Sequence, residues 1–205
     1  MELKKAIEMR TSIRSYLPDE IPEQDIREMI RLAGLAPSVN NFQPWGFILI
    51  RNKKKLQIMS QIISSKLGEF PKKESKVSAN VKSQVEWYST FFKDAPAVIA
   101  LVLEKYETVW ERGTSISHDE INQMRMYPDI QSTGACIQNL LLAATDMGYG
   151  ACWMSAPLIA CAELESLLNI KKPSRLISFV AIGKPAKKFL PKEKEDISKR
   201  LVVID

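Results

Sequence analysis

Apolar residues recur along the chain with two different periods, which predict helices that alternate with strands. Between residues 22 and 33 they fall three and four positions apart, at Ile26, Met29, Ile30 and Ala33, as on one face of a helix. Short continuous apolar runs predict strands instead. On these grounds helices are predicted at residues 2–9, 22–33, 54–67, 81–92, 129–148 and 158–169, and strands at 46–52, 95–104, 151–154, 176–184 and 201–205.

Two of these segments are the most apolar and are expected at the centre of the fold. The strand at residues 95–104 contains the run PAVIALVL and should be covered on both faces. The helix at residues 129–148 is apolar nearly all round and should be buried, with Asp129 as its N-cap and Gly148 as its stop. Residues 1–205 are therefore predicted to form a single α+β domain with a helix-covered sheet.

Residues 104–128 carry the weakest pattern of the chain and are predicted to form a loop or short-helix excursion, plausible as a lid. They contain His118, the only histidine, in the polar stretch SISHDE. One histidine is too few for a histidine-based metal site, and no triad can be built around it with confidence. We therefore interpret His118 as a solvated side chain.

The composition limits the cellular setting. No apolar run is long enough to span a bilayer, and the first ten residues lack the apolar core of a signal peptide. The cysteines are odd in number, have no C-x-x-C spacing and stand in apolar contexts, which indicates reduced and mostly buried thiols. A cytoplasmic protein is expected. The cysteines are Cys136, Cys152 and Cys161.

The formal net charge of +5 narrows the class of ligand. Lysines and arginines gather in three runs, but only Phe189 interrupts the C-terminal one, whereas nucleic-acid binding calls for interleaved aromatics. No nucleic-acid partner is therefore expected. A small anionic ligand, such as a phosphorylated cofactor, suits a modest positive charge better.

Familiar catalytic motifs are missing from the sequence. It contains no G-x-x-x-x-G-K-[ST] phosphate loop and no G-x-S-x-G nucleophile elbow. The GYG at residues 148–150 follows a helix and precedes a strand, which reverses the order of a dinucleotide-binding turn. If the protein is an enzyme, a cofactor is expected to supply the difficult chemistry.

The junction LAPSVNNFQPWGFILI, residues 35–50, is unusually rich in hydrogen-bonding and conformationally restricted residues. Ser38 and Asn41 offer short polar groups, while Pro37 and Pro44 restrict how the chain enters and leaves. One interpretation is an elaborate helix-to-strand turn. The other is a loop that holds a ligand.

Four segments, in one order along the chain, resemble the FMN-dependent nitroreductase family. They are RTSIRSY (10–16), APSVNNFQPWGF (36–47), CIQNLLLAATDMGYGACWM (136–154) and IGKPAK (182–187). The resemblance implies a three-layer α+β fold with a central, mostly antiparallel sheet and an intertwined homodimer. It also implies two FMN molecules at the subunit interface, each contacted by both chains.

The resemblance assigns flavin contacts to the first two segments. Arg10 and Ser12 would hold the phosphate and ribityl end, and Arg14 would lie near flavin N1 and O2. A dianionic phosphate needs cations and directed donors, and alternate residues of an extended segment point to one side. A solvated basic turn is the alternative. The partner subunit would supply the segment that lines the flavin, namely Pro37, Ser38, Val39 and Asn41.

Further contacts are implied near the C-terminal half. Met154, Ser155 and Ala156 match the segment that faces flavin N5 and O4, where a backbone N–H can donate to N5. Some family members have an acidic residue there, so the inherited substrate preference is left open. Lys199 and Arg200 match a basic position that closes on the phosphate, with Lys184 as a competitor. Residues 71–94 show no clear match to the polar flavin contacts of some members.

The implied activity is an NAD(P)H-dependent oxidoreductase. NADH or NADPH would deliver a hydride to flavin N5 and leave, and a nitroaromatic, quinone or similar small acceptor would then use the same space, in a ping-pong scheme. Ene reduction, dehalogenation and flavin breakdown on the same fold remain alternatives. A non-catalytic flavin-binding redox sensor or carrier is the alternative outside enzymes.

Overall fold

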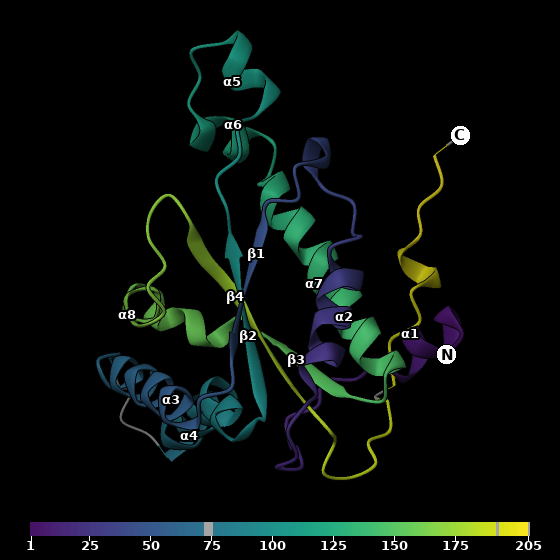
Figure 1. Ribbon diagram of the computed structural model, residues 1–205, viewed down its shortest axis with the longest axis vertical. Coiled ribbons are helices and arrows are strands. Elements are labelled where there is room, and N and C mark those ends of the chain that lie inside the picture. The colour runs from purple at the N-terminus through teal and green to yellow at the C-terminus, as the bar shows by residue number, and fades with distance from the viewer. Residues whose placement is uncertain (72–75, 192, 205) are drawn as a thin grey trace.

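The computed structural model describes residues 1–71, 76–191 and 193–204, without the side chains of residues 76–79 and 199. Its helices and strands follow the predicted order (Figure 1). The strands are β1 (Trp45–Ile50), β2 (Ala97–Leu103), β3 (Gly150–Met154) and β4 (Arg175–Gly183). The helices are α1 (Leu3–Met9), α2 (Glu23–Ala33), α3 (Lys53–Gly68), α4 (Lys76–Thr90), α5 (Val109–Gly113), α6 (His118–Met124), α7 (Pro128–Asp146) and α8 (Cys161–Leu167). Short 3-10 turns are η1 (Val39–Asn41), η2 (Phe91–Asp94), η3 (Ala156–Ala160) and η4 (Ser198–Arg200).

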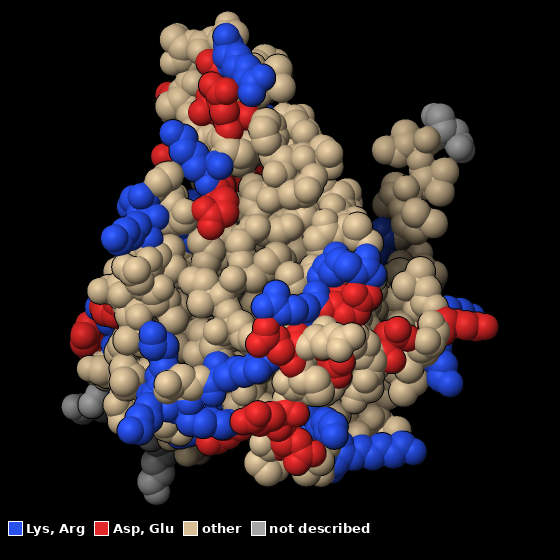
Figure 2. Space-filling view, viewed as in Figure 1, with Lys and Arg blue, Asp and Glu red and all other residues tan. Residues whose placement is uncertain are grey.

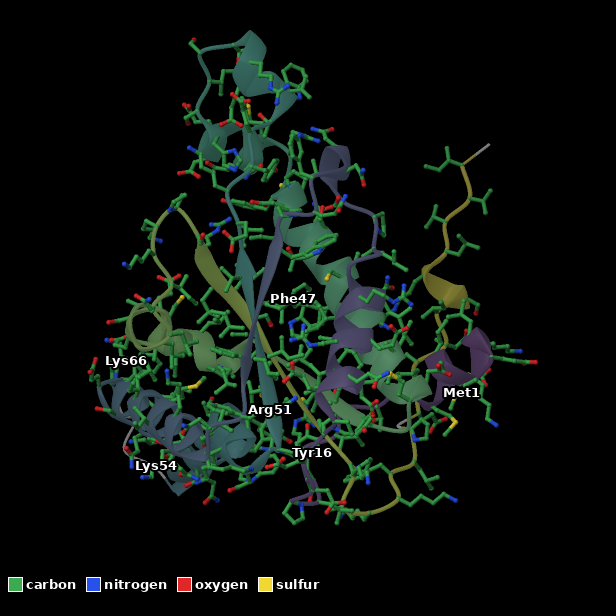
Figure 3. The ribbon with its side chains drawn as sticks, viewed as in Figure 1. Met1, Tyr16, Phe47, Arg51, Lys54 and Lys66 are labelled. Atoms are coloured by element: carbon green, nitrogen blue, oxygen red, sulfur yellow. The ribbon has the colours of Figure 1, made fainter. Side chains whose placement is uncertain are left out.

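The four strands form one antiparallel sheet in the order β1-β2-β4-β3. Every residue of β2 is buried, which confirms the prediction of a central strand covered on both faces. Ile99 and Leu101 pack in the cluster that contains α2 and α7, whereas Val98 and Ala100 pack in the cluster that contains α3 and α8. Because successive side chains alternate between faces, the sheet becomes the middle of three layers. Figure 3 shows Phe47 of β1 between the sheet and α7.

Helix α7 corrects two expectations. The helix begins at Pro128, with Tyr127 at the N-cap position, so Asp129 is not the N-cap. Proline suits the first helical position because its missing N–H has no partner there. The helix is also not buried all round, since its most deeply packed side chains cover only part of its circumference. Most of its half-buried residues form one stripe, Gly134, Ala135, Gln138, Asn139, Leu142 and Thr145.

Residues 104–128 form an ordered excursion with two short helices, α5 and α6, at one end of the molecule (Figure 1). Thr108 and Ser117 each cap a helix through a reciprocal bond with a glutamate three residues on. The interpretation of His118 as a solvated residue is wrong. Its Nδ1 lies 3.0 Å from Glu111 Oε2 and its Nε2 lies 2.8 Å from Asn122 Nδ2.

The C-terminal prediction of a strand is also wrong. Residues 201–204 are extended but exposed, and they pair with no strand of the described chain. An apolar strand needs a free sheet edge beside it, and this segment lies beyond α1, away from the sheet (Figure 1). The helix predicted at residues 158–169 is divided, because η3 precedes the shorter α8.

The expected burial of the cysteines and the expected end of α7 at Gly148 agree with the structure. Cys136 and Cys152 are buried, Cys161 is half-buried, and all three are free thiols. Burial raises the pKa of Cys136 to about 12. Gly148 ends α7 with a φ of 80°. Among the described residues, no helix has the length and apolarity needed to cross a membrane, and no cluster of His, Cys, Asp and Glu is arranged to hold a metal ion.

Candidate functional site

A cavity of about 800 Å³ lies where the chain leaves α1 and passes the end of β3. It brings together Arg10 and Ser12 from the first predicted segment and Ser155 from the third. Helix α7 forms another wall through Gln138 and Leu141. We call this space the Arg10 cavity. Its polar groups and cations can bind an anion, as the sequence predicts for the phosphate end of FMN.

The segment after α1 is held beside β3 by backbone contacts. Ile13 donates its N–H to the carbonyl of Ala151 at 3.1 Å, and Ser12 forms an isolated parallel bridge with Ala151. Ile13 is buried against Gly150, where an added Cβ would lie 2.7 Å from the Ile13 side chain. A glycine is therefore required for this close approach. With Ile13 turned inward, the neighbouring Ser12 and Arg14 point the other way.

Tyr16 anchors the far end of the same segment (Figure 3). Its hydroxyl donates to the carbonyl oxygens of Ile13 and Ala181, the latter at 3.2 Å. Burial raises the pKa of Tyr16, the Cys152 thiol adds to the effect, and Arg14 opposes it. Tyr16 therefore remains a neutral hydrogen-bond donor that fixes the basic segment against the sheet.

The three polar residues of the segment lie close to Cys152 of β3. Burial raises the pKa of the Cys152 thiol, and Arg14, Ser12 and Arg10 act in the opposite direction. All three side chains influence the Cys152 thiol, but only Arg10 and Ser12 line the Arg10 cavity. The Arg14 guanidinium itself stacks 5.1 Å from the Tyr88 ring centroid and 5.9 Å from that of Phe91, and Arg14 is not among the residues that line the Arg10 cavity.

At the end of β3, only part of the predicted segment is accessible. Met154 is 4% exposed, and its carbonyl accepts a hydrogen bond from the Ser178 hydroxyl at 3.0 Å. Ser155 and Ala156 are exposed at the start of η3. The first N–H groups of a helix have no acceptor within the helix. A ligand in the Arg10 cavity can therefore be met by the Ser155 hydroxyl as well as by the backbone N–H groups at the start of η3.

The second predicted segment lines a separate cavity of about 350 Å³. Pro37, Ser38 and Val39 form one side of it, together with Asn40, which the sequence analysis did not select. The other side comes from Arg125 at the end of α6 and from α7, through Pro128, Gln131, Ser132 and Ala135. We call this space the Val39 cavity.

The loop at the Val39 cavity is strongly shaped by its sequence. Asn40, Asn41 and Gln43 all have positive φ, at 48°, 57° and 50°, and asparagine tolerates this conformation better than most residues. The Ser38 hydroxyl accepts the N–H of Gln43 at 3.0 Å. The side chain of Asn41 accepts from Gln43 Nε2 at 2.9 Å, so it serves the loop itself in a single protomer.

The C-terminal basic residues are distributed differently from the sequence expectation. Lys194 lines the Arg10 cavity, whereas Lys184 lies 3.6 Å from Asp19 and Arg200 pairs with Glu195. The side chain of Lys199 lies outside the described residues. Nothing in the run PKEKEDISKR distinguishes Lys194 from its neighbours, so the sequence alone could not have selected it.

Among the residues that the structure describes, the two cavities have no lining residue in common, so a single protomer keeps the two predicted groups of flavin contacts apart. Both cavities border α7, at Gln138 in one case and at Gln131 and Ala135 in the other. Gln131 and Gln138 are seven residues apart, close to two helical turns, so they lie on one face of α7 about 10 Å from each other. Figure 2 shows a band of mostly uncharged side chains between the excursion and α2, and blue and red side chains mixed lower on the same face.

Comparison with known proteins shows which family the chain resembles over most of its length. The sequence model of the nitroreductase family matches residues 7–184. The chain is 29% identical to a putative NADH dehydrogenase/NAD(P)H nitroreductase of Methanothermobacter thermautotrophicus, over 91% of this chain and 78% of that protein. It is 25% identical to an iodotyrosine deiodinase of Hydra vulgaris, over 87% of this chain and 63% of the deiodinase. The crystal structure of a BluB-like flavoprotein from Clostridium difficile superposes with a TM-score of 0.85, at 26% identity and over the whole of both chains.

Proposed function

The chain belongs to the nitroreductase family, and from this premise we propose that it is an FMN-dependent enzyme that passes a hydride from NADH or NADPH to a small organic acceptor. The observation that carries the proposal is the division of the predicted flavin contacts between two cavities on one face of α7. A homodimer with α7 near its two-fold axis can bring the Arg10 cavity of one copy to the Val39 cavity of the other. Two equivalent sites then result.

The residues of the Arg10 cavity fit the phosphate end of FMN. Arg10 can offer a forked pair of N–H donors to phosphate oxygens, and the Ser12 hydroxyl can offer a third donor. Lys194 adds a positive charge from the C-terminal segment. These groups would hold the phosphate, while the backbone of Ser155 and Ala156 would meet the N5 edge of the ring.

When bound, FMN supplies the two-electron chemistry, since its ring accepts a hydride from a nicotinamide and passes one to an acceptor. The protein would contribute position and charge. Arg14 would counter negative charge at the N1 and O2 edge, with its guanidinium already constrained by Tyr88 and Phe91. The Pro37–Asn41 loop of the partner would exclude water from the ring face. One open space would serve donor and acceptor in turn, which gives ping-pong kinetics.

A direct experiment tests this proposal. The purified protein should be a homodimer by light scattering and should carry one FMN per chain. Under anaerobic conditions, NADH or NADPH should bleach the flavin absorbance, and a nitroaromatic or quinone should restore it. A monomer that retains stoichiometric FMN would contradict the shared site, and a flavin that neither nicotinamide bleaches would contradict the donor.

The similarity to iodotyrosine deiodinase favours reductive dehalogenation as a second candidate function. The chain spans 63% of that relative's length, so the relative's activity does not transfer as a whole. The two candidates differ in their product. Anaerobic incubation of the reduced protein with iodotyrosine would release iodide if dehalogenation is the activity, whereas a nitroreductase-type enzyme would turn over the nitro compound and leave iodotyrosine intact.

A further inference from the structure

Of the described residues that line the Val39 cavity, Arg125 alone is charged. It lies at the C-terminal end of α6, is exposed, and faces the same space as Ser38 and Val39. Within the described part of the chain, no carboxylate lies within 4 Å of its guanidinium. By contrast, Arg112 of the same excursion lies 2.9 Å from Glu107. The fork of donors on Arg125 is therefore available to a ligand.

The turn that carries Arg125 is backbone-strained. The next two residues, Met126 and Tyr127, both have positive φ, at 56° and 55°. Left-handed conformations cost energy in residues other than glycine, and they persist only where the surroundings enforce them. Here Tyr127 donates its N–H to the carbonyl of Asn122 at 2.6 Å, and Gln131 Nε2 donates to the carbonyl of Met126 at 2.7 Å.

A buried polar network holds this turn in place. Asn122 and Asp129 are 2% and 1% exposed, and Asn122 Nδ2 donates to Asp129 Oδ2 at 3.0 Å. The Tyr106 hydroxyl donates to Asn122 Oδ1 at 3.2 Å, and His118 Nε2 lies 2.8 Å from Asn122 Nδ2. The network ties α6 to the first turn of α7. The protein's own hydrogen bonds therefore fix the backbone position of Arg125 relative to the Pro37–Asn41 loop without a bound ligand.

We propose that Arg125 is a specificity-determining residue that binds a carboxylate or phosphate group of the molecule stacked on the flavin. The inference rests on the proposed function. That proposal places the flavin held by the partner's Arg10 cavity against the Val39 cavity that Arg125 lines. A guanidinium recognises such oxyanions through two parallel hydrogen bonds, which also orient the ligand. The anion belongs either to the acceptor or to the phosphates of the nicotinamide donor.

The test compares matched ligands on the FMN-loaded dimer. The variants are Arg125→Gln, which removes the charge, and Arg125→Lys, which keeps it without the fork. Arg112→Gln is the control, since that arginine is on the same excursion but paired with Glu107. The acceptor pair is 4-nitrobenzoate and 4-nitrobenzamide, which differ mainly in charge. The donor pair is NADH and 1-benzyl-1,4-dihydronicotinamide, which has no phosphate.

For Arg125→Gln we expect a selective loss. Removing a charge-assisted hydrogen bond should lower kcat/KM roughly ten-fold to a hundred-fold for the charged member of one pair and leave its neutral partner nearly unchanged. A loss confined to nitrobenzoate assigns the anion to the acceptor, and a loss confined to NADH assigns it to the donor. Arg125→Lys should recover part of the activity. Equal losses for charged and neutral ligands, or no loss at all, would overturn the proposal.

A binding measurement separates this inference from the proposed function. Benzoate and benzamide can be titrated into the oxidised, FMN-loaded dimer and followed by the change in the visible flavin spectrum. Weaker benzoate binding in Arg125→Gln, with unchanged benzamide binding, supports the role of Arg125. This holds even if the enzyme turns over no nitro compound, because that result contradicts only the proposed reaction. Equal benzoate affinity in wild type and Arg125→Gln, together with unchanged donor kinetics, overturns the role of Arg125.

Discussion

Val39 donates its backbone N–H to the Ser132 hydroxyl at 3.0 Å, and this bond ties the Pro37–Asn41 loop to α7. Ser132 itself donates to the carbonyl of Pro128 at 2.6 Å, so its hydroxyl is held in one orientation. Residues 93 positions apart are thereby fixed to each other at the cavity that the partner's flavin is proposed to face. The loop is therefore held against α7 and is more than a connection between α2 and β1.

Replacing Ser132 by alanine should loosen this loop. The substitution leaves the Val39 N–H without its acceptor, which costs about 1–3 kcal/mol in the free energy of unfolding. FMN affinity should fall as well. Urea denaturation and FMN titration measure the two effects. Ser65→Ala, on an exposed position of α3, is the matched control, and equal changes in the two variants would contradict the role of the Ser132 hydroxyl.

Arg10→Ala should weaken FMN binding without unfolding the protein. A charge-assisted hydrogen bond contributes about 1.5–3 kcal/mol, which corresponds to a roughly ten-fold to hundred-fold increase in Kd, and Ser12→Ala should have a smaller effect. Fluorescence titration with FMN measures the change. Arg27→Ala removes an exposed arginine that pairs with Glu23 at 2.6 Å and should leave the Kd unchanged. Unaltered FMN affinity in Arg10→Ala would remove the phosphate assignment.

The strongly patterned parts of the fold could be predicted from the sequence. The run PAVIALVL predicts β2 because a strand covered on both faces must be apolar at every position, and the structure buries all of Ala97–Leu103. The spacing of Ile26, Met29 and Ala33 predicts α2, and these three residues are buried. Each of these elements follows from a pattern of apolar residues within one continuous segment, and such a pattern can be recognised in a single sequence.

The errors concern contacts between distant or weakly patterned segments. Glu111, His118 and Asn122 form a chain of hydrogen bonds across two short helices, and no apolar period connects them, so His118 was interpreted as solvated. Asp129 resembles an N-cap in sequence, but the network from Asn122 uses its carboxylate. The apolar segment at residues 201–204 has strand composition without an adjacent edge in its own chain.

The site was predictable as a set of segments and less so as individual residues. The resemblance selected Arg10 and Ser12, which line the Arg10 cavity, and Ser38 and Val39, which line the Val39 cavity. It selected Asn41, whereas the structure places Asn40 at the second cavity and bonds the Asn41 amide to Gln43. Lys194 and Arg125 were missed because each lies in a segment without a recognisable pattern.

Arg14→Met should lower the midpoint potential of the bound flavin. If the guanidinium lies near N1 and O2, its loss removes stabilisation of the reduced, more negative form, and each 1.4 kcal/mol corresponds to about 30 mV for a two-electron couple. A shift of some tens of millivolts is expected. Spectroelectrochemical titration measures it, with Arg14→Lys as the variant that keeps the charge. A variant that loses FMN but keeps its potential would show that Arg10 and Arg14 have been assigned the wrong way round.

The last prediction concerns acid stability of the excursion. Burial raises the pKa of Glu111, but hydrogen bonds from His118 and Thr108 outweigh this effect and bring the value to about 2, below the ordinary 4.5. A carboxyl whose pKa is lower in the folded protein stabilises the fold above the unfolded-state value. The contribution should be complete above about pH 4.5 and should disappear as the pH falls towards 2.

Glu111→Gln isolates this contribution. At pH 7 the variant should unfold at a lower urea concentration than the wild type, and the difference should shrink as the pH is lowered from about 4.5 towards 2, where the wild-type carboxyl becomes protonated. Protein and FMN concentrations must be held constant, because ligand and subunit binding also shift the midpoint. Glu107→Gln is the control, since Glu107 is on the same excursion but pairs with Arg112 at the exposed surface. A difference for Glu111→Gln that stays the same across this range would show that the hydrogen bonds from Thr108 and His118 do not depend on the charge of Glu111.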